Sequence, residues 1–255
     1  MRITWLLDLS PGYELDDSSG LLADALAARD HETRIITIER PSSYFGGRLA
    51  EWIEIDDWRM ADFEEADAVI ATSPRTARVA GERAIRNLDA PIVADEIYRE
   101  RTPREHEPLR VLLPGASQSD DANIDDGYGA IAHARWFHQK IELVRMAPWA
   151  PSREEPLDSI EEFHVGLSAQ ETIRLLHSCD IVVVPGTPGL IARAAMAAGI
   201  PLLTRAKTAV ELGEKLIEVL TDHELRDRLR TDGREKAKAW RADVVADKLE
   251  KDFGF

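Results

Sequence analysis

The chain has 255 residues, of which 44% are hydrophobic, and its formal net charge at pH 7 is −15. A typical domain has about 100–150 residues, so two modest domains are expected rather than one. The acidic excess argues against a protein that holds nucleic acid or an anionic membrane by its overall charge. No apolar run approaches the ~20 residues of a membrane-spanning helix, and the first apolar run is too short for a signal peptide, so a soluble cytoplasmic protein is predicted.

The first part of the chain alternates apolar runs with helical patterns. Strands are predicted at 3–7, 34–38, 66–71 and 91–94. One helix is expected to begin near Gly20, and a second is capped by Ser73 and runs to about Asn87. Residues 49–62 show no clean period, so no element is predicted there. The pattern is the opening of a Rossmann-type unit, but the loop at 9–19 lacks the dinucleotide glycine fingerprint, which argues against NAD binding.

A charged, proline-containing stretch at 95–108 is the best linker candidate, and a second α/β pattern follows it. Strands are predicted at 109–113, 141–146, 163–165 and 181–184, with another starting at 202. Helices are predicted within 124–137, at 170–178, 190–198, 209–220 and 222–232, and from 234 to about 253.

The segment at 180–204, DIVVVPGTPGLIARAAMAAGIPLLT, holds a buried strand, a glycine-rich turn, a helix and the start of another strand. Its turn at 185–189 follows a predicted parallel strand and leads into a helix N-terminus. Such turns bind anionic groups in α/β proteins, because main-chain amides converge there. Many turns of this kind are empty in doubly wound folds, so the pattern alone leaves ligand binding open.

Four stretches of the second half share one pattern of small and apolar residues: LRVLLPGAS at 109–117, EEFHVGLSAQETIRLLHSCDIVVVPG at 161–186, GLIARAAMAAGIPLLT at 189–204 and the closing stretch at 212–240. Together they resemble the nucleotide-sugar-binding domain of GT-B fold glycosyltransferases, of the family 4 or group 1 type. The first half matches more loosely at 21–38 and 66–83. The resemblance implies an α/β protein with GT-B-like architecture, in which two Rossmann-like domains have parallel sheets facing across a cleft. It implies a short acceptor-side domain at 1–105, a nucleotide-sugar domain at 106–235, and a C-terminal helix at 236–255 that crosses back to the first domain.

The resemblance also implies that a nucleotide-diphospho-sugar donor lies against the glycine turns of the second domain. The residues expected to bind it are Gly115, Ala116, Ser117, Gly166, Gly186, Thr187, Gly189, Leu190 and Arg193. Main-chain amides of the turns would stabilise the leaving diphosphate, and Arg193 either adds its charge or is a solvated surface residue. Both glutamates that the family carries seven residues apart are missing, since the turn at 185–189 has no acid and Ala194 stands before the alanine-methionine pair. The basic pair expected after the strand at 109–113 is missing as well.

Candidate catalytic groups come from loops that are predicted to face the cleft. They are Asp16, Asp17 and His164, and Asp8 shares their predicted edge. The two neighbouring aspartates equally fit a solvated, helix-capping face, and the histidine fits a half-buried imidazole. No metal site is predicted, because His133 and His138 point to different faces of a helix and the acidic pairs lack the calcium-loop spacing. No cofactor is expected beyond the donor substrate.

These features predict a glycosyltransferase that moves a sugar from a nucleotide-diphospho-sugar to an unidentified acceptor, with retention if the resemblance holds. The missing glutamates favour an alternative, a catalytically weakened GT-B homologue that binds sugar nucleotides or serves as a partner subunit. A third reading is another two-domain sugar-nucleotide enzyme, such as an epimerase. The expected partners are the donor, the acceptor and, in the second reading, another protein or a second copy of the chain.

Overall fold

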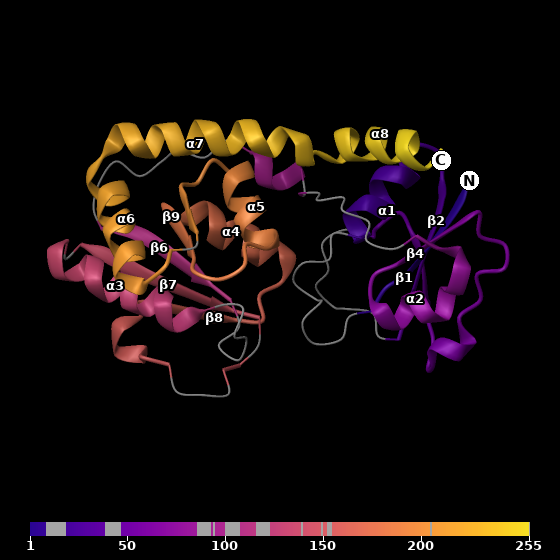
Figure 1. The fold of residues 1–255 in the computed structure, drawn as a ribbon, viewed down its shortest axis with the longest axis horizontal. Helices are drawn as coiled ribbons and strands as arrows, with labels where there is room; N and C mark the ends of the chain where they lie inside the picture. The colour runs from indigo at the N-terminus through magenta and orange to yellow at the C-terminus, as the bar shows by residue number, and fades with distance from the viewer. Residues whose placement is uncertain are drawn as a thin grey trace. The chain divides into compact units, whose positions relative to one another are not determined.

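The structure is a computed structural model that describes residues 1–8, 19–38, 47–85, 93, 95–99, 108–115, 123–138, 140–148, 150–151, 155–204 and 206–254. These residues form two compact units, each built on its own sheet (Figure 1). Unit 1 comprises Met1–Asp95 together with Ala239–Phe255, and unit 2 comprises Glu96–Lys238. The predicted linker at 95–108 begins at the boundary between the units, although residues 100–107 lie outside the described residues.

Unit 1 contains a five-stranded sheet in which neighbouring strands are parallel. Its strands are β1 (Arg2–Leu6), β2 (Glu32–Thr37), β3 (Glu51–Glu54), β4 (Ala68–Ala71) and β5 (Ala84–Ile85). Its helices are α1 (Ser19–Ala27), α2 (Pro74–Ala80) and α8 (Ala242–Phe253). The strand order β3-β2-β1-β4-β5 shows that the chain moves from β1 to one edge and then crosses back to the other side of β1.

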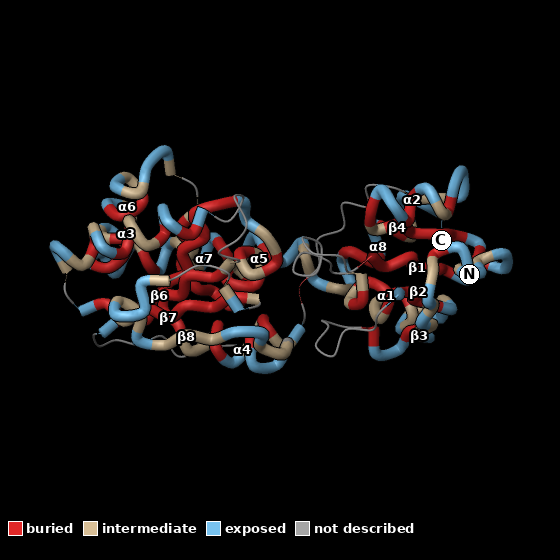
Figure 2. The backbone as a smooth tube through the Cα atoms, turned by 90° about the horizontal axis from the view of Figure 1, so that it is seen from below, coloured by how far each residue is buried: buried red, intermediate tan, exposed pale blue. Residues whose placement is uncertain are grey.

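Both faces of this sheet are buried, because successive side chains of a strand point to opposite faces. Trp5 of β1 packs in a cluster with residues of α1 and α8. The next residue, Leu6, packs in a second cluster that contains Trp58 and Ala80, the last residue of α2. The central strands accordingly appear as a buried interior in Figure 2.

The last helix of the chain completes the core of unit 1. Leu249 of α8 is 3% exposed and belongs to the same cluster as Trp5. Charged groups fix the helix from outside, since the Arg29 guanidinium at the end of α1 lies 2.6 Å from Asp247 Oδ1 and 2.9 Å from Glu250 Oε2. The core of the first unit therefore includes residues from both ends of the described chain.

Two predictions in unit 1 are wrong. Residues 49–62 contain β3, which pairs with β2 at the edge of the sheet and leaves its side chains half-buried or exposed, so no apolar alternation marks it. Helix α2 ends at Ala80 rather than near Asn87, because Gly81 has a φ of +61° and turns the chain toward β5. That left-handed backbone strongly favours glycine. The strand predicted at 91–94 lies outside the described residues except for Val93.

Unit 2 repeats the same topology with a second parallel sheet. Its strands are β6 (Leu109–Pro114), β7 (Ile141–Ala147), β8 (Glu162–Val165), β9 (Ile181–Val184) and β10 (Leu202–Thr204). Its helices are α3 (Ile124–Phe137), α4 (Ala169–Ser178), α5 (Leu190–Ala197), α6 (Ala209–Thr221) and α7 (His223–Ala237). The strand order is β10-β9-β6-β7-β8, so β6 is the central strand of this sheet, as β1 is of the other.

The apolar strands of unit 2 are covered on both faces. Val111 and Leu113 of β6 pack in one cluster with residues of α3 and α6. Leu112, between them, is 1% exposed and faces the other side, and α5 and α7 pack against each other in this unit (Figure 1). Such burial on both faces explains why the strands at 109–113 and 181–184 were recognisable as continuous apolar runs.

A third wrong prediction concerns the end of the chain, where one helix is expected from 234 to about 253. The structure has two helices, because α7 ends at Ala237 and α8 begins at Ala242. Backbone carbonyls at the break accept hydrogen bonds from another part of the chain, since Tyr98 Oη donates to Ala237 O over 2.7 Å and Val93 N donates to Trp240 O over 3.0 Å. Tyr98 precedes its partner by 139 positions, so no local pattern marks the break.

The predicted α/β class with two Rossmann-like parallel sheets is confirmed. Among the helices of the described residues, none has the length and apolar character required to cross a bilayer.

Candidate functional site

The order in which the chain adds strands to the sheet of unit 2 reverses between β6 and β9. From β6 the chain builds outward through β7 to β8, and it then returns to place β9 on the other side of β6. Val111 pairs with Ile181 and Leu112 with Val182, so the two strands run in register toward the same edge. In open α/β sheets, ligands bind outside the carboxyl ends of the strands at such a switch point. The predicted donor-binding turns after β6 and β9 begin at this edge.

The turn after β9 leads into the N-terminus of α5. Pro185 and Gly186 are buried, whereas Thr187 is exposed. Gly189 is the N-cap of α5 and makes no side-chain capping bond, because glycine has no side chain. The amides of the first helical turn have no intrahelical acceptor, and together with the helix dipole they favour an anion. The turn therefore brings Gly186, Thr187, Gly189 and Leu190 to one edge of the switch point.

The alanine-rich sequence of α5 fixes this N-terminus firmly. Leu190, at the first helical position, is 5% exposed, and Ala194 and Ala195 are 2% and 0% exposed. Small side chains let the helix pack closely on the sheet and on α7. An anion at this N-terminus would thus meet amides on a rigid element, which is a favourable arrangement for recognition.

Gly115 shapes the neighbouring turn after β6. Its φ is 135°, a backbone conformation that side-chain-bearing residues rarely adopt. Its amide is already used, since Gly115 N donates to Met146 O over 3.0 Å. The Gly115 amide is therefore used within the sheet. The predicted neighbours Ala116 and Ser117 lie outside the described residues.

Arg193 is half-buried on the first turn of α5. Its amide donates to Gly189 O over 3.2 Å, the first hydrogen bond within the helix. Its position along the helix puts a cationic side chain within one turn of the amides described above. The structure thus keeps Arg193 with the turn at 185–189 in one local element.

The predicted residues His164 and Gly166 belong to the other edge of the sheet. They lie on β8 and just after it, and β6 and β7 separate that strand from β9. Strands are about 4.8 Å apart, so His164 is on the order of 14 Å from the turn at 185–189. The Gly166 amide donates to Ala147 O over 3.0 Å and continues the sheet pairing.

His164 is engaged in a local pair. Its Nε2 lies 3.2 Å from Glu162 Oε2, on the same strand. Burial would by itself raise the pKa of the Glu162 carboxyl, but the hydrogen bond from His164 and the charge of Arg110 outweigh burial and lower this pKa. Glu162 is therefore ionised at neutral pH and holds the imidazole in place, which fits the half-buried structural histidine weighed above.

Asp16 and Asp17 lie outside the described residues. Asp8 follows β1, at the switch point of unit 1, and is 5% exposed. Ser73 Oγ donates to Asp8 Oδ2 over 2.7 Å, and Asp8 N donates to Thr72 Oγ1 over 2.9 Å. Ser73 is also the N-cap of α2. Asp8 thus joins the end of β1 to the start of α2 in a buried polar cluster.

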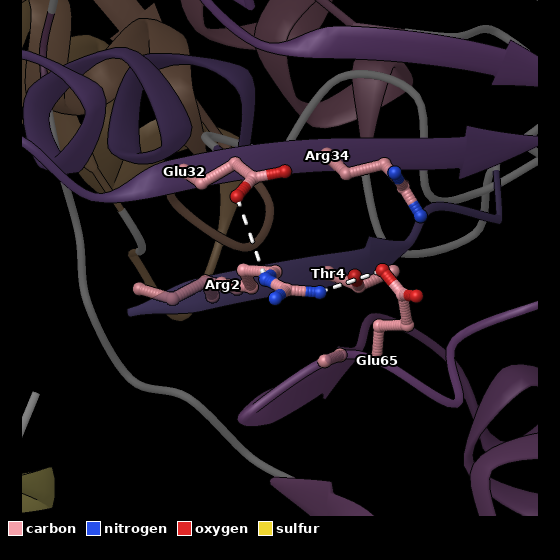
Figure 3. Close-up of a pocket in the computed structure, with 7 residues that line it drawn as sticks. Arg2, Thr4, Glu32, Arg34 and Glu65 are labelled. Carbon is pink, nitrogen blue, oxygen red and sulfur yellow. Dashed lines mark hydrogen bonds and ion pairs between the residues drawn. The ribbon is translucent and has the colours of Figure 1, made fainter.

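A small hollow of about 10 Å³ lies on unit 1 (Figure 3). It is at the amino ends of the strands, opposite the edge where ligands of parallel sheets bind. Its charges are paired, since Arg2 Nη1 is 2.6 Å from Glu65 Oε2 and Arg34 Nε is 2.8 Å from Glu51 Oε2. A space of this size holds about one water molecule, so we assign it no ligand. Across the described ranges, no three His, Cys, Asp or Glu side chains gather in a way that could hold a metal ion.

Sequence reasoning missed one group near the switch point. Arg145 is fully buried on β7, and its Nε lies 3.0 Å from Glu155 Oε2, whose side chain is 3% exposed. Tyr128 of α3 donates its hydroxyl to the same Glu155 oxygen. The signal in the sequence was a charged residue deep in the apolar part of a strand that is covered on both faces, whereas Glu142, the other charged residue of β7, is only half-buried near its start.

Comparisons with known proteins agree with this geometry. No family model and no curated protein matches the chain. Solved structures do: WaaG, a glycosyltransferase involved in lipopolysaccharide biosynthesis, is 15% identical with a TM-score of 0.66, and the match covers 98% of each chain. Sucrose-phosphate synthase from Thermosynechococcus elongatus is 13% identical with a TM-score of 0.64, over 100% of this chain and 98% of that one. HepE from Anabaena, solved with UDP and glucose, is 10% identical with a TM-score of 0.62, over 100% of this chain and 99% of that one.

At these identities the likeness establishes the fold. The chain has the GT-B fold, as its sequence pattern predicts.

Proposed function

We propose that the chain is a glycosyltransferase that binds a nucleotide-diphospho-sugar at the switch point of unit 2 and transfers its sugar to an acceptor, with retention and without a resident cofactor. The observation that carries the proposal is the turn at 185–189, which leads from the carboxyl end of a parallel strand into the N-terminus of α5 through a glycine N-cap. A diphosphate is the anion that suits such a site, because amides and the helix dipole can meet several phosphate oxygens at once. HepE, solved with UDP and glucose, has the same fold.

The chemistry requires stabilisation of a departing diphosphate. The bond between the anomeric carbon and the phosphate oxygen breaks, a bond from the acceptor oxygen to that carbon forms, and the acceptor proton leaves with the diphosphate or to solvent. Negative charge grows on the diphosphate while the sugar gains oxocarbenium-like character. The amides at the start of α5 and the Arg193 guanidinium would stabilise that growing charge.

One feature, the missing carboxylates, favours a second reading. In that reading the chain is a weakened homologue that binds sugar nucleotides within a complex. The turn at 185–189 carries no carboxylate, and Ala194, at the other position where the family has a glutamate, is 2% exposed against the core. The GtfA/B complex contains a chain of similar fold, which is 12% identical with a TM-score of 0.51. The match covers 90% of the present chain and 54% of that chain.

A panel of nucleotide sugars separates these readings. We expect the full chain to bind at least one of them and to hydrolyse it slowly or transfer its sugar, as measured by calorimetry and by release of nucleoside diphosphate. Binding without turnover across a wide acceptor screen would support the partner reading. Conversion of free UDP-GlcNAc to an epimer would instead reveal an isomerase, and failure to bind any nucleotide sugar would contradict both leading readings.

Replacing Arg193 by alanine should weaken binding of the nucleotide sugar severalfold, because one cation near a diphosphate is lost. The matched control is Arg228→Ala on α7, where an exposed arginine is removed from the same unit. Calorimetric titration of both variants checks the prediction. Equal affinities for the two variants would remove Arg193 from the site.

A further inference from the structure

One buried charge in unit 2 lies close to the proposed donor site without belonging to it. Arg145 is 0% exposed and stands near the carboxyl end of β7, directly opposite Leu113 of β6. Arginine is almost never fully buried unless it is paired, so its retention in this sheet needs a physical reason. The contacts of the guanidinium supply that reason.

The guanidinium joins four parts of the unit. Its Nη1 donates to Leu113 O over 3.1 Å and to Met146 O over 2.5 Å, at the ends of two strands. Its Nη2 donates to Glu155 Oε1 over 3.2 Å. Its Nε donates to the hydroxyl of Tyr128 over 3.1 Å.

The network is internally satisfied. Burial raises the pKa of the Tyr128 hydroxyl, and the hydrogen bond to Glu155 raises it further, so this hydroxyl stays protonated and can donate. Within the described part of the chain, the positive charge of Arg145 is paired with the carboxylate of Glu155, whose side chain is 3% exposed. A buried network with all partners present rigidifies its surroundings.

Two of these bonds meet the chain where β6 ends and the turn begins. Leu113 O lies one residue before the last residue of β6, and Met146 O also accepts the amide hydrogen of Gly115. The guanidinium and the Gly115 amide therefore share one acceptor. The direction in which the chain leaves β6 depends on that shared contact.

We infer that Arg145 is a positioning residue of the donor site: its buried guanidinium fixes the ends of β6 and β7 to Glu155 and so holds Gly115 in place where the chain leaves β6. The inference rests on the proposed function, because the turn matters to a donor only if the switch point binds one. A lysine could not replace it, since only the forked guanidinium reaches two carbonyls, a hydroxyl and a carboxylate together.

The same sheet provides a matched control. Arg110 on β6 is 7% exposed, and its Nη2 lies 2.5 Å from Glu162 Oε2 at the opposite, amino edge of the sheet. Arg110→Met and Arg145→Met each remove one buried, paired arginine from one sheet. If the role of Arg145 is only structural, the two variants should behave alike.

A double variant separates stability from position. Arg145→Met alone leaves the buried Glu155 carboxylate without its guanidinium, so this variant is expected to unfold at lower temperature than the wild-type protein. Arg145→Met combined with Glu155→Met replaces the buried pair with apolar side chains, which often restores stability. That double variant should fold but still lack the bonds to Leu113 O and Met146 O.

The first readout is affinity for a nucleotide sugar that the wild-type chain binds. We expect the double variant to bind it about tenfold more weakly, because small displacements of positioning groups cost this much or more. Arg110→Met should stay within about twofold of wild type at a temperature where both are folded. Equal losses in the two variants would overturn the inference.

The second readout needs no ligand. Hydrogen exchange at the Gly115 amide should become faster in the double variant and remain unchanged in Arg110→Met, because only the former disturbs Met146 O. Unchanged exchange in the double variant would overturn the inference even where affinity falls. If the wild-type chain binds no nucleotide sugar, the proposed function fails, while the exchange measurement still decides whether Arg145 holds the turn.

Discussion

Replacing Gly189 by aspartate is expected to weaken binding of nucleoside diphosphates on the order of 100-fold while the protein keeps its stability or gains a few tenths of a kcal/mol. Gly189 is the N-cap of α5 and has an extended backbone, with φ −111° and ψ −152°, that any residue can adopt. An aspartate there would accept hydrogen bonds from the first helical amides and cap the helix. The same carboxylate would occupy the anion site and repel a diphosphate. Affinity should therefore fall while stability stays the same or rises. Calorimetric titration measures the affinity, and thermal unfolding measures the stability.

Gly189→Asn is the matched control for this substitution. Asparagine caps a helix about as well as aspartate and has nearly the same shape, but it carries no charge. We expect it to lose far less affinity than Gly189→Asp. If both variants bind nucleoside diphosphates as the wild-type chain does, the start of α5 is not the anion site. If both lose affinity equally, the effect comes from crowding of the turn rather than from charge.

Leu249→Ala should lower the free energy of unfolding of unit 1 by about 2–5 kcal/mol, the usual cost of truncating a buried leucine. Leu249 is 3% exposed in the core that α8 shares with β1 and α1. Tryptophan fluorescence in a denaturant titration reports on this unit, because Trp5 and Trp58 are buried in its core. The fluorescence midpoint should move to lower denaturant concentration.

Val244→Ala provides the comparison on the same helix. Val244 is 43% exposed, so its truncation should change the stability of unit 1 by no more than about 0.5 kcal/mol. Equal shifts in the two variants would show that α8 does not complete the core of unit 1. A normal midpoint for Leu249→Ala would lead to the same conclusion.

The central part of the fold was predictable because its signals are local. In the segment at 180–204, four β-branched residues predict a buried strand, Gly189 precedes the helix, and Gly199 follows it with a φ of +67°. The structure has β9, α5 and β10 there, close to the expected bounds. Continuous apolar runs of this kind arise where both faces of a strand are covered, so strand identity and burial come from the same pattern.

The features that sequence reasoning missed are set by distant contacts. Strand β3 has few buried side chains and owes its strand conformation to pairing with β2. At the break between α7 and α8, the Ala237 carbonyl binds Tyr98, which lies 139 positions earlier. Neither contact leaves a periodic trace in the local sequence, and local propensity yields to tertiary structure in both places.

The candidate site was only partly predictable for the same reason. The turn at 185–189 was found from its glycines and from the helix that follows. Gly115 was expected to offer its amide to a ligand. That amide instead donates to Met146 O on β7, a strand that begins at Ile141. The buried Arg145 was missed, because its partners come from α3, β6 and Glu155 and only the fold brings them together.

A crystal structure of the full chain with a bound nucleoside diphosphate tests the central claim most directly. The account predicts diphosphate oxygens within hydrogen-bonding distance of the main-chain amides at the start of α5, outside the carboxyl ends of β6 and β9. A diphosphate held elsewhere on the chain, with the start of α5 left to solvent, would contradict it.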